Sequence, residues 1–359
     1  MLRLNGSHNR LPSTILIVGI LVACFGLLAI YDASVVDAFR TFGDKLRYVK
    51  QQSVWIIIGV IVATITAAIP LTLIKKYSHI LFGITLFFMV AVLIPGIGSK
   101  FLGARRWIDI GFMVIQPSEL LKISLVIYLA KWLEQERSLK HFLVLLGINL
   151  LLIMLQPDLG TALIIIAVSF MIYYLSGAKI KEIITFCAIL AVAIGVLIIL
   201  SPYRMNRMKT FIDPTNDPLG SSYHINQVLY GLGSGGMNGV GLGRSRQKYA
   251  YLPEATTDSI FVIIAEEFGY VGSSLFVLFL ISLLASSFKI ALNVHDKFDK
   301  LLSSGISLLF LIQIFVNLSS MVALVPLTGV PLPFISYGGS SLVTNFIALG
   351  LLINISKRI

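Results

Sequence analysis

The sequence predicts an all-α, polytopic membrane protein with about ten transmembrane helices. Three observations lead to this prediction: 57% of the residues are hydrophobic, only 13% are charged, and the mean hydropathy is +0.91. Soluble domains carry about 25% charged residues, so the bilayer has to be the solvent for most of these side chains. We therefore expect residues 1–359 to form a single integral membrane domain.

Ten apolar runs are candidates for spanning helices, because about 20 mostly apolar residues cross the hydrocarbon core of a bilayer. They are Thr14–Tyr31, Ser53–Ile69, His79–Ile94, Ser118–Trp132, Phe142–Leu155, Thr161–Ser176, Ile183–Leu200, Ile260–Phe288, Leu302–Val325 and Leu342–Ile355. Arg3 and Arg10 precede the first run, as in a signal peptide, but no small-residue cleavage site follows it. We expect this run to be a retained helix.

The basic residues predict the orientation of the chain. An even number of spans places both termini on one side of the membrane. When the long loop 201–257 is set aside, more Lys and Arg residues lie on the side of the termini than on the other. The positive-inside rule then predicts cytoplasmic termini. The net charge of +11 would suggest nucleic acid for a soluble protein, but here the basic residues lie between apolar runs, and no nucleic-acid partner is expected.

The loop 201–257 joins the seventh and eighth predicted helices on the outer face and is the longest polar stretch. Long ordered loops are usually functional. Its glycine-dense run, residues 231–243, resembles a nucleotide-binding loop at first sight. No strand precedes the run and no Gly-Lys-Ser/Thr follows it, which excludes that function. The glycines are better explained by close backbone packing or by approach to a ligand.

Asp258 ends this loop, directly before the eighth apolar run. Two interpretations remain open from the sequence: an N-cap of the helix, or a functional carboxylate at a membrane cavity. The positive end of the helix dipole is expected to keep the carboxyl ionised. In that state it could accept a proton from a sugar hydroxyl or hold a divalent cation.

Further ionisable residues lie within predicted helices. Glu119 and Lys122 are three positions apart and share a helix face, where they either neutralise each other or line a polar cavity. Glu266 and Glu267 lie two turns beyond Asp258. At least one of them should face the bundle interior, because a carboxylate that faces lipid is costly.

Two outer segments carry distinctive residues. Arg105 and Arg106 adjoin Trp107, a pattern that suits either an interfacial anchor or phosphate contacts. The segment 326–341 is rich in proline and glycine, which disfavour a regular helix. Irregular backbone at membrane depth is tolerated only against protein or a water-filled cavity.

Seven motifs follow one another along nearly the whole chain. They are Gly103–Ile108, Gln116–Lys122, Gln156–Thr161, the loop at Asp213, Tyr251–Phe261, Ala265–Gly269 and Pro331–Ser341. Each is weak alone, but in this order they are highly specific. The chain resembles the SEDS family (shape, elongation, division and sporulation), bacterial membrane proteins of the FtsW and RodA type.

This resemblance implies a ten-helix fold and a peptidoglycan glycosyltransferase that polymerises lipid II on the outer face of the cytoplasmic membrane. It maps the family's essential loop aspartate onto Asp258, and family residues of the central cavity onto Glu119 and Lys122. Ser259 stands where the family usually has Phe. The amino-acid sequence of the loop is more similar to the FtsW type than to RodA, which favours a role in cell division.

Asp258 is thus the expected catalytic residue, which acts as general base for the acceptor sugar hydroxyl or orients the base. The candidate substrate-binding residues are Glu119, Lys122, Lys50, Arg105, Arg106, Glu254, Ser336 and Ser340. Lys50, Arg105 and Arg106, or a divalent cation (Mg²⁺ or Mn²⁺) at Asp258, would stabilise the leaving pyrophosphate. No organic cofactor is expected.

The expected partners are lipid II with the undecaprenyl-pyrophosphate-linked glycan strand, a class B penicillin-binding protein, and divisome or elongation proteins. Two other functions remain open. A transporter that flips lipid II across the membrane would also carry polar groups inside a helix bundle. A non-catalytic scaffold that only recruits a penicillin-binding protein would not need the loop carboxylate.

Overall fold

The computed structural model describes residues 11–359 except 102–103, 112, 200–201, 214–216, 218–219, 221 and 250. Its long helices are α1 (Leu11–Phe42), α2 (Arg47–Ala68), α3 (Leu71–Ala91), α4 (Pro117–Trp132), α5 (Leu139–Leu155), α6 (Leu159–Leu175), α7 (Ile180–Ile199), α10 (Ile260–Asn293), α11 (Lys297–Met321) and α12 (Gly339–Ser356). Two shorter helices, α8 (Pro202–Ile212) and α9 (Tyr223–Gly235), lie between α7 and α10.

Each of the ten predicted apolar runs overlaps one of the long helices. Within the described residues, α1, α2, α3, α10, α11 and α12 are long and apolar enough to cross a membrane, and α5 and α6 are shorter apolar helices. A helical, multi-pass membrane protein is therefore confirmed, while the number of ten spans stays a prediction. The predicted end of the seventh run, Leu200, lies outside the described residues, as do Arg3, Arg10 and Gly103.

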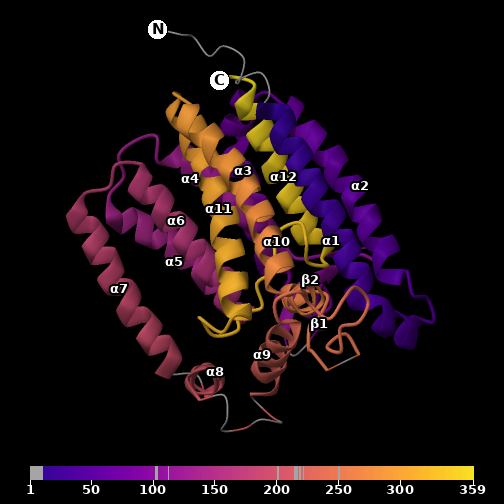
Figure 1. Ribbon diagram of the computed structural model, residues 1–359. Helices are drawn as coiled ribbons and strands as arrows, with labels where there is room; N and C mark the ends of the chain where they lie inside the picture. The colour runs from indigo at the N-terminus through magenta and orange to yellow at the C-terminus, as the bar shows by residue number, and fades with distance from the viewer. Residues whose placement is uncertain are drawn as a thin grey trace.

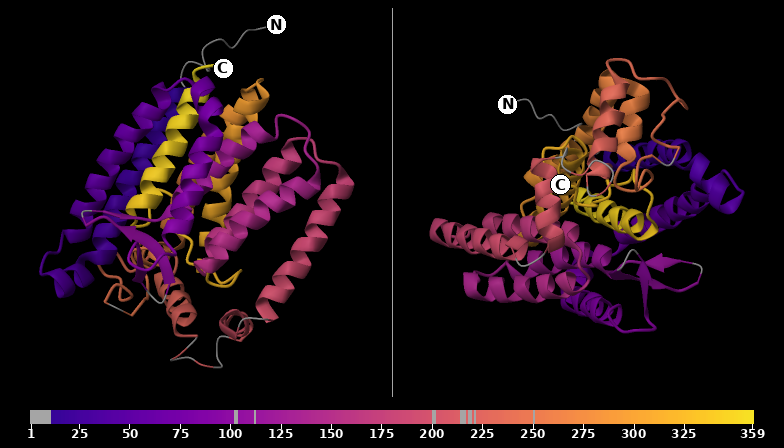
Figure 2. Two further views of the ribbon diagram at one scale, coloured as in Figure 1. Left: turned by 180° about the vertical axis from the view of Figure 1, so that it is seen from behind. Right: turned by 90° about the horizontal axis from the view of Figure 1, so that it is seen from below.

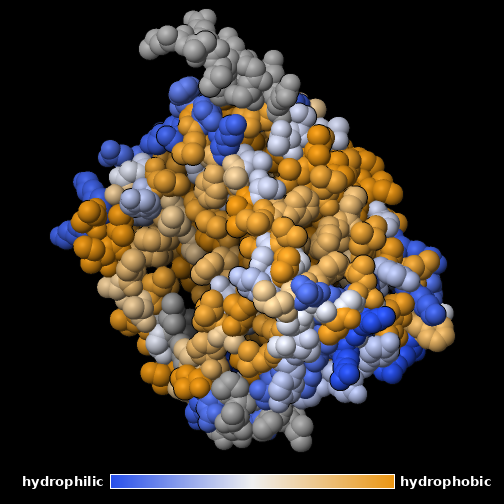
Figure 3. Space-filling view, viewed as in Figure 1, coloured by the Kyte–Doolittle hydropathy of each residue, from blue (hydrophilic) through white to orange (hydrophobic). Residues whose placement is uncertain are grey.

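The surface has the pattern expected of a protein in a bilayer. Large apolar side chains such as Leu28, Phe87 and Phe315 are more than 60% exposed on the outer faces of their helices. Figure 3 shows a broad apolar band across the middle of one face of the molecule, with hydrophilic residues gathered towards its two ends. In water this band would be an aggregation-prone surface, whereas in lipid it is solvated.

The two ends of the bundle differ in structure. The start of α1 and the end of α12 lie at one end, whereas α8, α9 and a small sheet lie at the opposite end (Figures 1 and 2). This arrangement agrees with the prediction that both termini lie on one side. That this side is cytoplasmic stays a prediction.

Small residues bring distant parts of the chain together. A Cβ added at Gly59 of α2 would lie 2.3 Å from the Phe346 ring of α12, and one at Gly350 would lie 2.4 Å from the Ala63 carbonyl oxygen. The two helices can therefore pack closely, as is common in membrane bundles. Near its N-terminus the long helix α10 has a break at Gly269, whose backbone is non-helical (φ 66°, ψ −167°).

The sequence did not predict the sheet. Strands β1 (Gly98–Phe101), β2 (Ala104–Asp109) and β3 (Val114–Ile115) form an antiparallel sheet between α3 and α4. Strands of two to six residues are too short to show a clear alternation of polar and apolar side chains. The all-α prediction therefore holds for the bundle and misses this sheet, and the predicted loop 201–257 is itself partly helical.

Candidate active site

Asp258 lies at the end of the bundle that carries α8, α9 and the sheet. Its side chain is buried, and its carbonyl oxygen accepts a hydrogen bond of 2.8 Å from Asn317 Nδ2 on α11. The N-cap position of α10 is Ser259, whose side chain makes no capping hydrogen bond. Of the two interpretations that the sequence left open for Asp258, capping is therefore wrong.

A second carboxylate lies beside Asp258. The Thr257 hydroxyl is 2.7 Å from Glu254 Oε2 and 3.3 Å from Asp258 Oδ1, so it bridges the two acids. Glu254 has a left-handed backbone (φ 51°), which is uncommon for a residue with a side chain. Its carbonyl oxygen accepts hydrogen bonds from the backbone N–H groups of Thr257 (3.1 Å) and Ser259 (3.2 Å). Backbone strain of this kind is often found at functional sites.

The surroundings of Asp258 change its acidity. Burial raises the pKa of this carboxyl from the ordinary 3.8 to about 7, and the Glu254 charge adds to the rise. The hydrogen bond from Thr257 and the positive charge of Arg207 lower the pKa by less. Burial therefore outweighs the helix dipole, and the carboxyl changes its charge near neutral pH instead of staying ionised throughout. A base with a pKa near neutral pH is well suited to proton transfer.

The proline- and glycine-rich segment after α11 packs over this site. Asn317 Nδ2 also donates to the Val330 carbonyl (2.8 Å), and the Tyr337 N–H donates to the Thr256 carbonyl (2.9 Å). A Cβ added at Gly329, which has φ 71°, would lie 3.9 Å from Asp258 Oδ2. The irregular backbone predicted here is confirmed, and it is buried against protein as the physics of the bilayer requires.

Two residues at the site were missed as candidates. Arg207 of α8 donates to the Leu327 carbonyl (2.6 Å), and its charge acts on both Asp258 and His224. His224 of α9 lies 2.9 Å from the Ser259 hydroxyl through Nε2. Burial, and then the Arg207 charge, lower the pKa of His224 to about 4. The sequence shows that the loop is basic, but no motif or spacing in it distinguishes Arg207 or His224 from the other polar residues of the loop.

Glu119 and Lys122 form a buried ion pair on α4. The distance from Lys122 Nζ to Glu119 Oε1 is 2.8 Å, and both side chains are less than 5% exposed. The shared helix face predicted for these residues is confirmed. Among the described residues, Glu119 Oε2 and Lys122 Nζ have no hydrogen bond besides this ion pair. A buried pair adds little stability compared with apolar residues, so stability alone does not account for its presence.

Three predicted substrate-binding residues hold backbone groups in place. Arg106 Nε donates to the Gln156 carbonyl (2.8 Å), and its Nη2 donates to the Pro157 carbonyl. The Ser336 hydroxyl accepts from the Leu332 N–H (2.8 Å). The Ser340 hydroxyl accepts from the Gln116 N–H (3.0 Å) and donates to the Val114 carbonyl (3.1 Å).

The other predicted cations, Lys50 and Arg105, are at least partly exposed. Lys50, in the first turn of α2, forms an exposed ion pair of 2.8 Å with Asp44. Arg105 is half-buried on β2. Exposed ion pairs contribute little to stability, so Lys50 could exchange Asp44 for an anionic ligand. The structure thus gathers Asp258, Glu254 and Arg207 around one point and leaves Lys50 outside this group.

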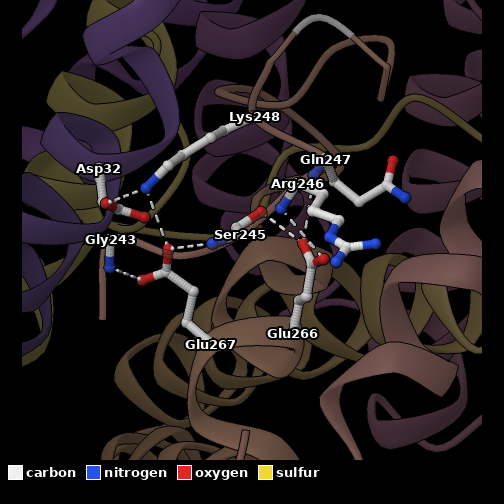
Figure 4. A network of polar contacts seen from close by, with 8 residues as sticks. All are labelled: Asp32, Gly243, Ser245, Arg246, Gln247, Lys248, Glu266 and Glu267. Carbon is white, nitrogen blue, oxygen red and sulfur yellow. Dashed lines mark hydrogen bonds and ion pairs between the residues drawn. The ribbon is translucent and has the colours of Figure 1, made fainter. Parts of the chain in front are cut away.

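Both glutamates of α10 face the interior, which confirms the prediction that at least one does. Glu267 accepts hydrogen bonds from the Ser245 N–H (3.0 Å), the Gly243 N–H (3.0 Å) and Lys248 Nζ (3.1 Å). Lys248 Nζ also lies 2.8 Å from Asp32 Oδ1 on α1. Figure 4 shows Lys248 between these two carboxylates. The loop is thereby joined to both α1 and α10.

The Glu266 carboxylate holds the backbone of the same loop. It accepts hydrogen bonds from the N–H groups of Arg246 (3.1 Å) and Gln247 (3.3 Å) and from the Ser245 hydroxyl (Figure 4). The Ser234 hydroxyl on α9 lies 3.2 Å from Glu266 Oε1. Residues 243–248 are therefore fixed on α10 two turns from Asp258.

The glycine-dense run serves packing, as one of the two sequence interpretations predicted. A Cβ added at Gly231 of α9 would lie 2.5 Å from Val262 Cγ1, and one at Gly235 would lie 2.3 Å from the Ala265 carbonyl oxygen. Only glycine lets α9 approach α10 this closely.

Comparison with known proteins extends over nearly the whole chain. The family model of FtsW, RodA and SpoVE, described as "Cell cycle protein", matches residues 12–359. Stage V sporulation protein E of Bacillus subtilis (strain 168) is 38% identical over 352 residues, which are 96% of each chain. A "Probable peptidoglycan glycosyltransferase FtsW" of Geobacter sp. (strain M18) is 35% identical over 352 residues, again 96% of each chain.

Solved structures share the fold. A chain from "Structural coordination of polymerization and crosslinking by a peptidoglycan synthase complex" has a TM-score of 0.80 and 26% identity, over 96% of this chain and 97% of that one. The Rod shape determining protein RodA of Thermus thermophilus has a TM-score of 0.71 and 25% identity, over 96% of both chains.

Proposed function

Because the chain belongs to the FtsW, RodA and SpoVE family of cell cycle proteins, we propose that it is a peptidoglycan glycosyltransferase of the cytoplasmic membrane. Its substrate is lipid II, and its product is a glycan strand on the outer face. Relatives named FtsW and the sporulation protein of Bacillus support a role in division or sporulation rather than elongation. The observation that carries the chemistry is the buried Asp258 carboxyl, whose pKa is raised to about 7.

In the proposed reaction Asp258 acts as general base. It takes the proton from the 4-hydroxyl of the GlcNAc of one lipid II molecule. The oxygen then forms a bond to the anomeric carbon of the MurNAc at the end of the growing strand. The bond from that carbon to the pyrophosphate oxygen breaks, its electron pair leaves with undecaprenyl pyrophosphate, and the configuration inverts from α to β. Glu254 supports this role because its charge helps to raise the pKa of Asp258.

The leaving pyrophosphate needs positive charge nearby. The positive charge of Arg207 acts on Asp258, so Arg207 is a better candidate for this contact than the exposed Lys50. Arg105 on β2 remains a candidate, and Lys122, with Glu119, is proposed to contact the substrate inside the bundle. Arg106, Ser336 and Ser340 are proposed to act by holding the surrounding backbone.

A divalent cation is the alternative source of positive charge for the leaving pyrophosphate. Among the described residues there is no group of three or more His, Cys, Asp or Glu side chains placed to bind a metal. Mg²⁺, however, commonly takes only one or two carboxylates and completes its shell with phosphate oxygens and water. Asp258 and Glu254, bridged by the Thr257 hydroxyl, fit that requirement. A cation held there would neutralise charge on the pyrophosphate.

The partner is proposed to be a class B penicillin-binding protein, which would crosslink the strands that this chain makes. The similarity to a chain of a peptidoglycan synthase complex supports this assignment. Cytoplasmic termini would place Asp258, α8 and α9 on the outer face, where lipid II is polymerised.

The test is polymerisation of purified lipid II by the full chain together with its penicillin-binding protein. Asp258→Asn should abolish polymer formation, and Asp296→Asn, the same change at the exposed N-cap of α11, is the control. If Asp258→Asn polymerises at the wild-type rate, the proposed base is wrong. Movement of labelled lipid II across the membrane of reconstituted vesicles, without formation of a glycan polymer, would instead favour a flippase.

A further inference from the structure

His224 and Ser259 form a hydrogen-bonded pair next to Asp258, since Ser259 is the following residue in the chain. The distance from His224 Nε2 to Ser259 Oγ is 2.9 Å. Ser259 is fully buried and follows Asp258 in the chain. As the N-cap residue of α10 it could use its hydroxyl to cap the helix, but it makes no such bond. Its hydroxyl is directed to α9 instead.

This pair ends a line of close contacts between α9 and α10. His224, Val228, Gly231 and Gly235 follow at helical spacing on one face of α9. Gly231 meets Val262 and Gly235 meets Ala265, at distances that leave no room for a Cβ. Since these contacts hold the distal part of α9 on α10, the pair at residue 224 fixes how its first turn meets the start of α10.

Besides the hydrogen bonds within its own turn, the described backbone around Asp258 has two anchors from the part of the chain beyond α10. Asn317 binds the Asp258 carbonyl, and Tyr337 binds the Thr256 carbonyl. Both anchors act on peptide groups up to residue 258. His224 is the anchor that acts just after it, at the point where the chain enters the helix, so the three together define the direction of the Asp258 side chain.

We propose that His224 is a positioning residue, which through the Ser259 hydroxyl fixes the first turn of α10 and thereby aims the Asp258 carboxylate at the acceptor hydroxyl. This inference rests on the proposed role of Asp258 as the base. Proton transfer demands a short, well-directed contact, and small displacements of the base slow it strongly. His224 need not touch the substrate, so its effect belongs to the rate of the chemical step and not to the affinity for lipid II.

The test is a double-mutant cycle in the lipid II polymerisation assay. His224→Ala and Ser259→Ala should each lower kcat about tenfold, the effect of one lost hydrogen bond. KM for lipid II should not change. The double variant should be no slower than either single variant, because both changes remove the same bond.

A matched pair of conservative variants separates positioning from folding. His224→Gln can place an amide group near the position of the imidazole Nε2 and should keep most of the activity. His224→Asn has the same chemistry but is shorter, and should be as slow as His224→Ala. Elution of each variant as a single peak from size exclusion shows that the bundle is intact, and the Gln and Asn variants give the answer even if the Ala variant does not fold.

The outcomes separate this inference from the proposed function. If Asp258→Asn is inactive but His224→Ala and His224→Asn keep the wild-type kcat, the positioning role is wrong and the base is unaffected. Additive effects in the double variant, or a change in KM alone, also overturn the positioning role. If Asp258→Asn is active, the proposed base fails first, whatever the His224 variants do.

Discussion

Lys248 Nζ lies 3.1 Å from Glu267 Oε1, and both side chains are less than 5% exposed. The same ammonium group also binds Asp32 on α1, so one lysine of the loop between α9 and α10 compensates two carboxylates on helices that are far apart in the sequence. A buried charge is tolerated only with partners. The position of the loop is therefore tied to the electrostatics of the bundle, and the loop ends at Asp258.

Removal of this lysine should destabilise the protein. Lys248→Met leaves Asp32 and Glu267 without their cation and should lower the free energy of unfolding by about 3–5 kcal/mol, as for other broken buried pairs. Thermal unfolding in detergent measures this change. Lys50→Met, which breaks the exposed pair with Asp44, is the control and should unfold at the wild-type temperature. Equal melting temperatures for both variants would contradict the role given to Lys248.

The rate should depend on pH through Asp258. Burial, supported by Glu254, raises the pKa of this carboxyl to about 7. A general base works only when deprotonated, so kcat should fall as the pH drops through about 7. Glu254→Gln removes a cause of the raised pKa and should move this acid limb to lower pH. Thr257→Val removes a hydrogen bond that lowers the pKa and should move the limb to higher pH. Shifts in the same direction would show that the limb does not report Asp258.

The buried pair on α4 allows stability and activity to be separated. Glu119→Gln or Lys122→Met alone leaves one buried charge uncompensated, and each should cost about 3–5 kcal/mol of stability. The double variant removes both charges and should unfold close to the wild-type temperature. If the pair contacts the substrate, the stable double variant should still fail to polymerise lipid II. A double variant that is both stable and active would assign the pair to the fold alone.

Glycines within one short helix provide another matched test. Gly235→Ala places a methyl group against the Ala265 backbone, which cannot move aside, and should lower stability by about 1–3 kcal/mol. Gly233→Ala, two residues earlier in α9, meets nothing within 4 Å. Its better helix propensity should leave stability unchanged or raise it by up to about 1 kcal/mol. Melting temperatures in the reverse order would contradict the packing of α9 on α10.

The orientation can be measured by labelling. In a chain whose exposed cysteines, Cys24 and Cys187, are replaced by Ala, Tyr249→Cys in the half-exposed part of the loop should react with a membrane-impermeant maleimide in intact cells. Lys357→Cys, at the other end of the bundle, should react only after the membrane is opened. The opposite pattern would place Asp258 on the cytosolic side, where it could not polymerise lipid II at the outer surface.

Local features of the sequence predicted much of the fold and part of the site. Length and hydropathy of each run predicted the helices, because a segment in lipid has to satisfy its own backbone hydrogen bonds. The motif order identified Asp258 and the Glu119–Lys122 pair. The sheet, Arg207 and His224 were not predicted. Arg207 and His224 matter through partners such as Leu327 and Ser259, which lie 120 and 35 positions away in the chain.

The sequence by itself determined a bundle of membrane helices with a carboxylate at the start of one of them. Only the tertiary structure decided what that carboxylate can do. The dipole of α10 favours an ionised Asp258, and this much follows from its place in the chain. Burial under the segment after α11 has the opposite effect and is larger, so the pKa of the carboxyl rises. The free energy lost when a carboxylate is removed from water exceeds the free energy gained from the partial positive charge at the helix start. Desolvation depends on every neighbour in space, and no local pattern in the sequence records it.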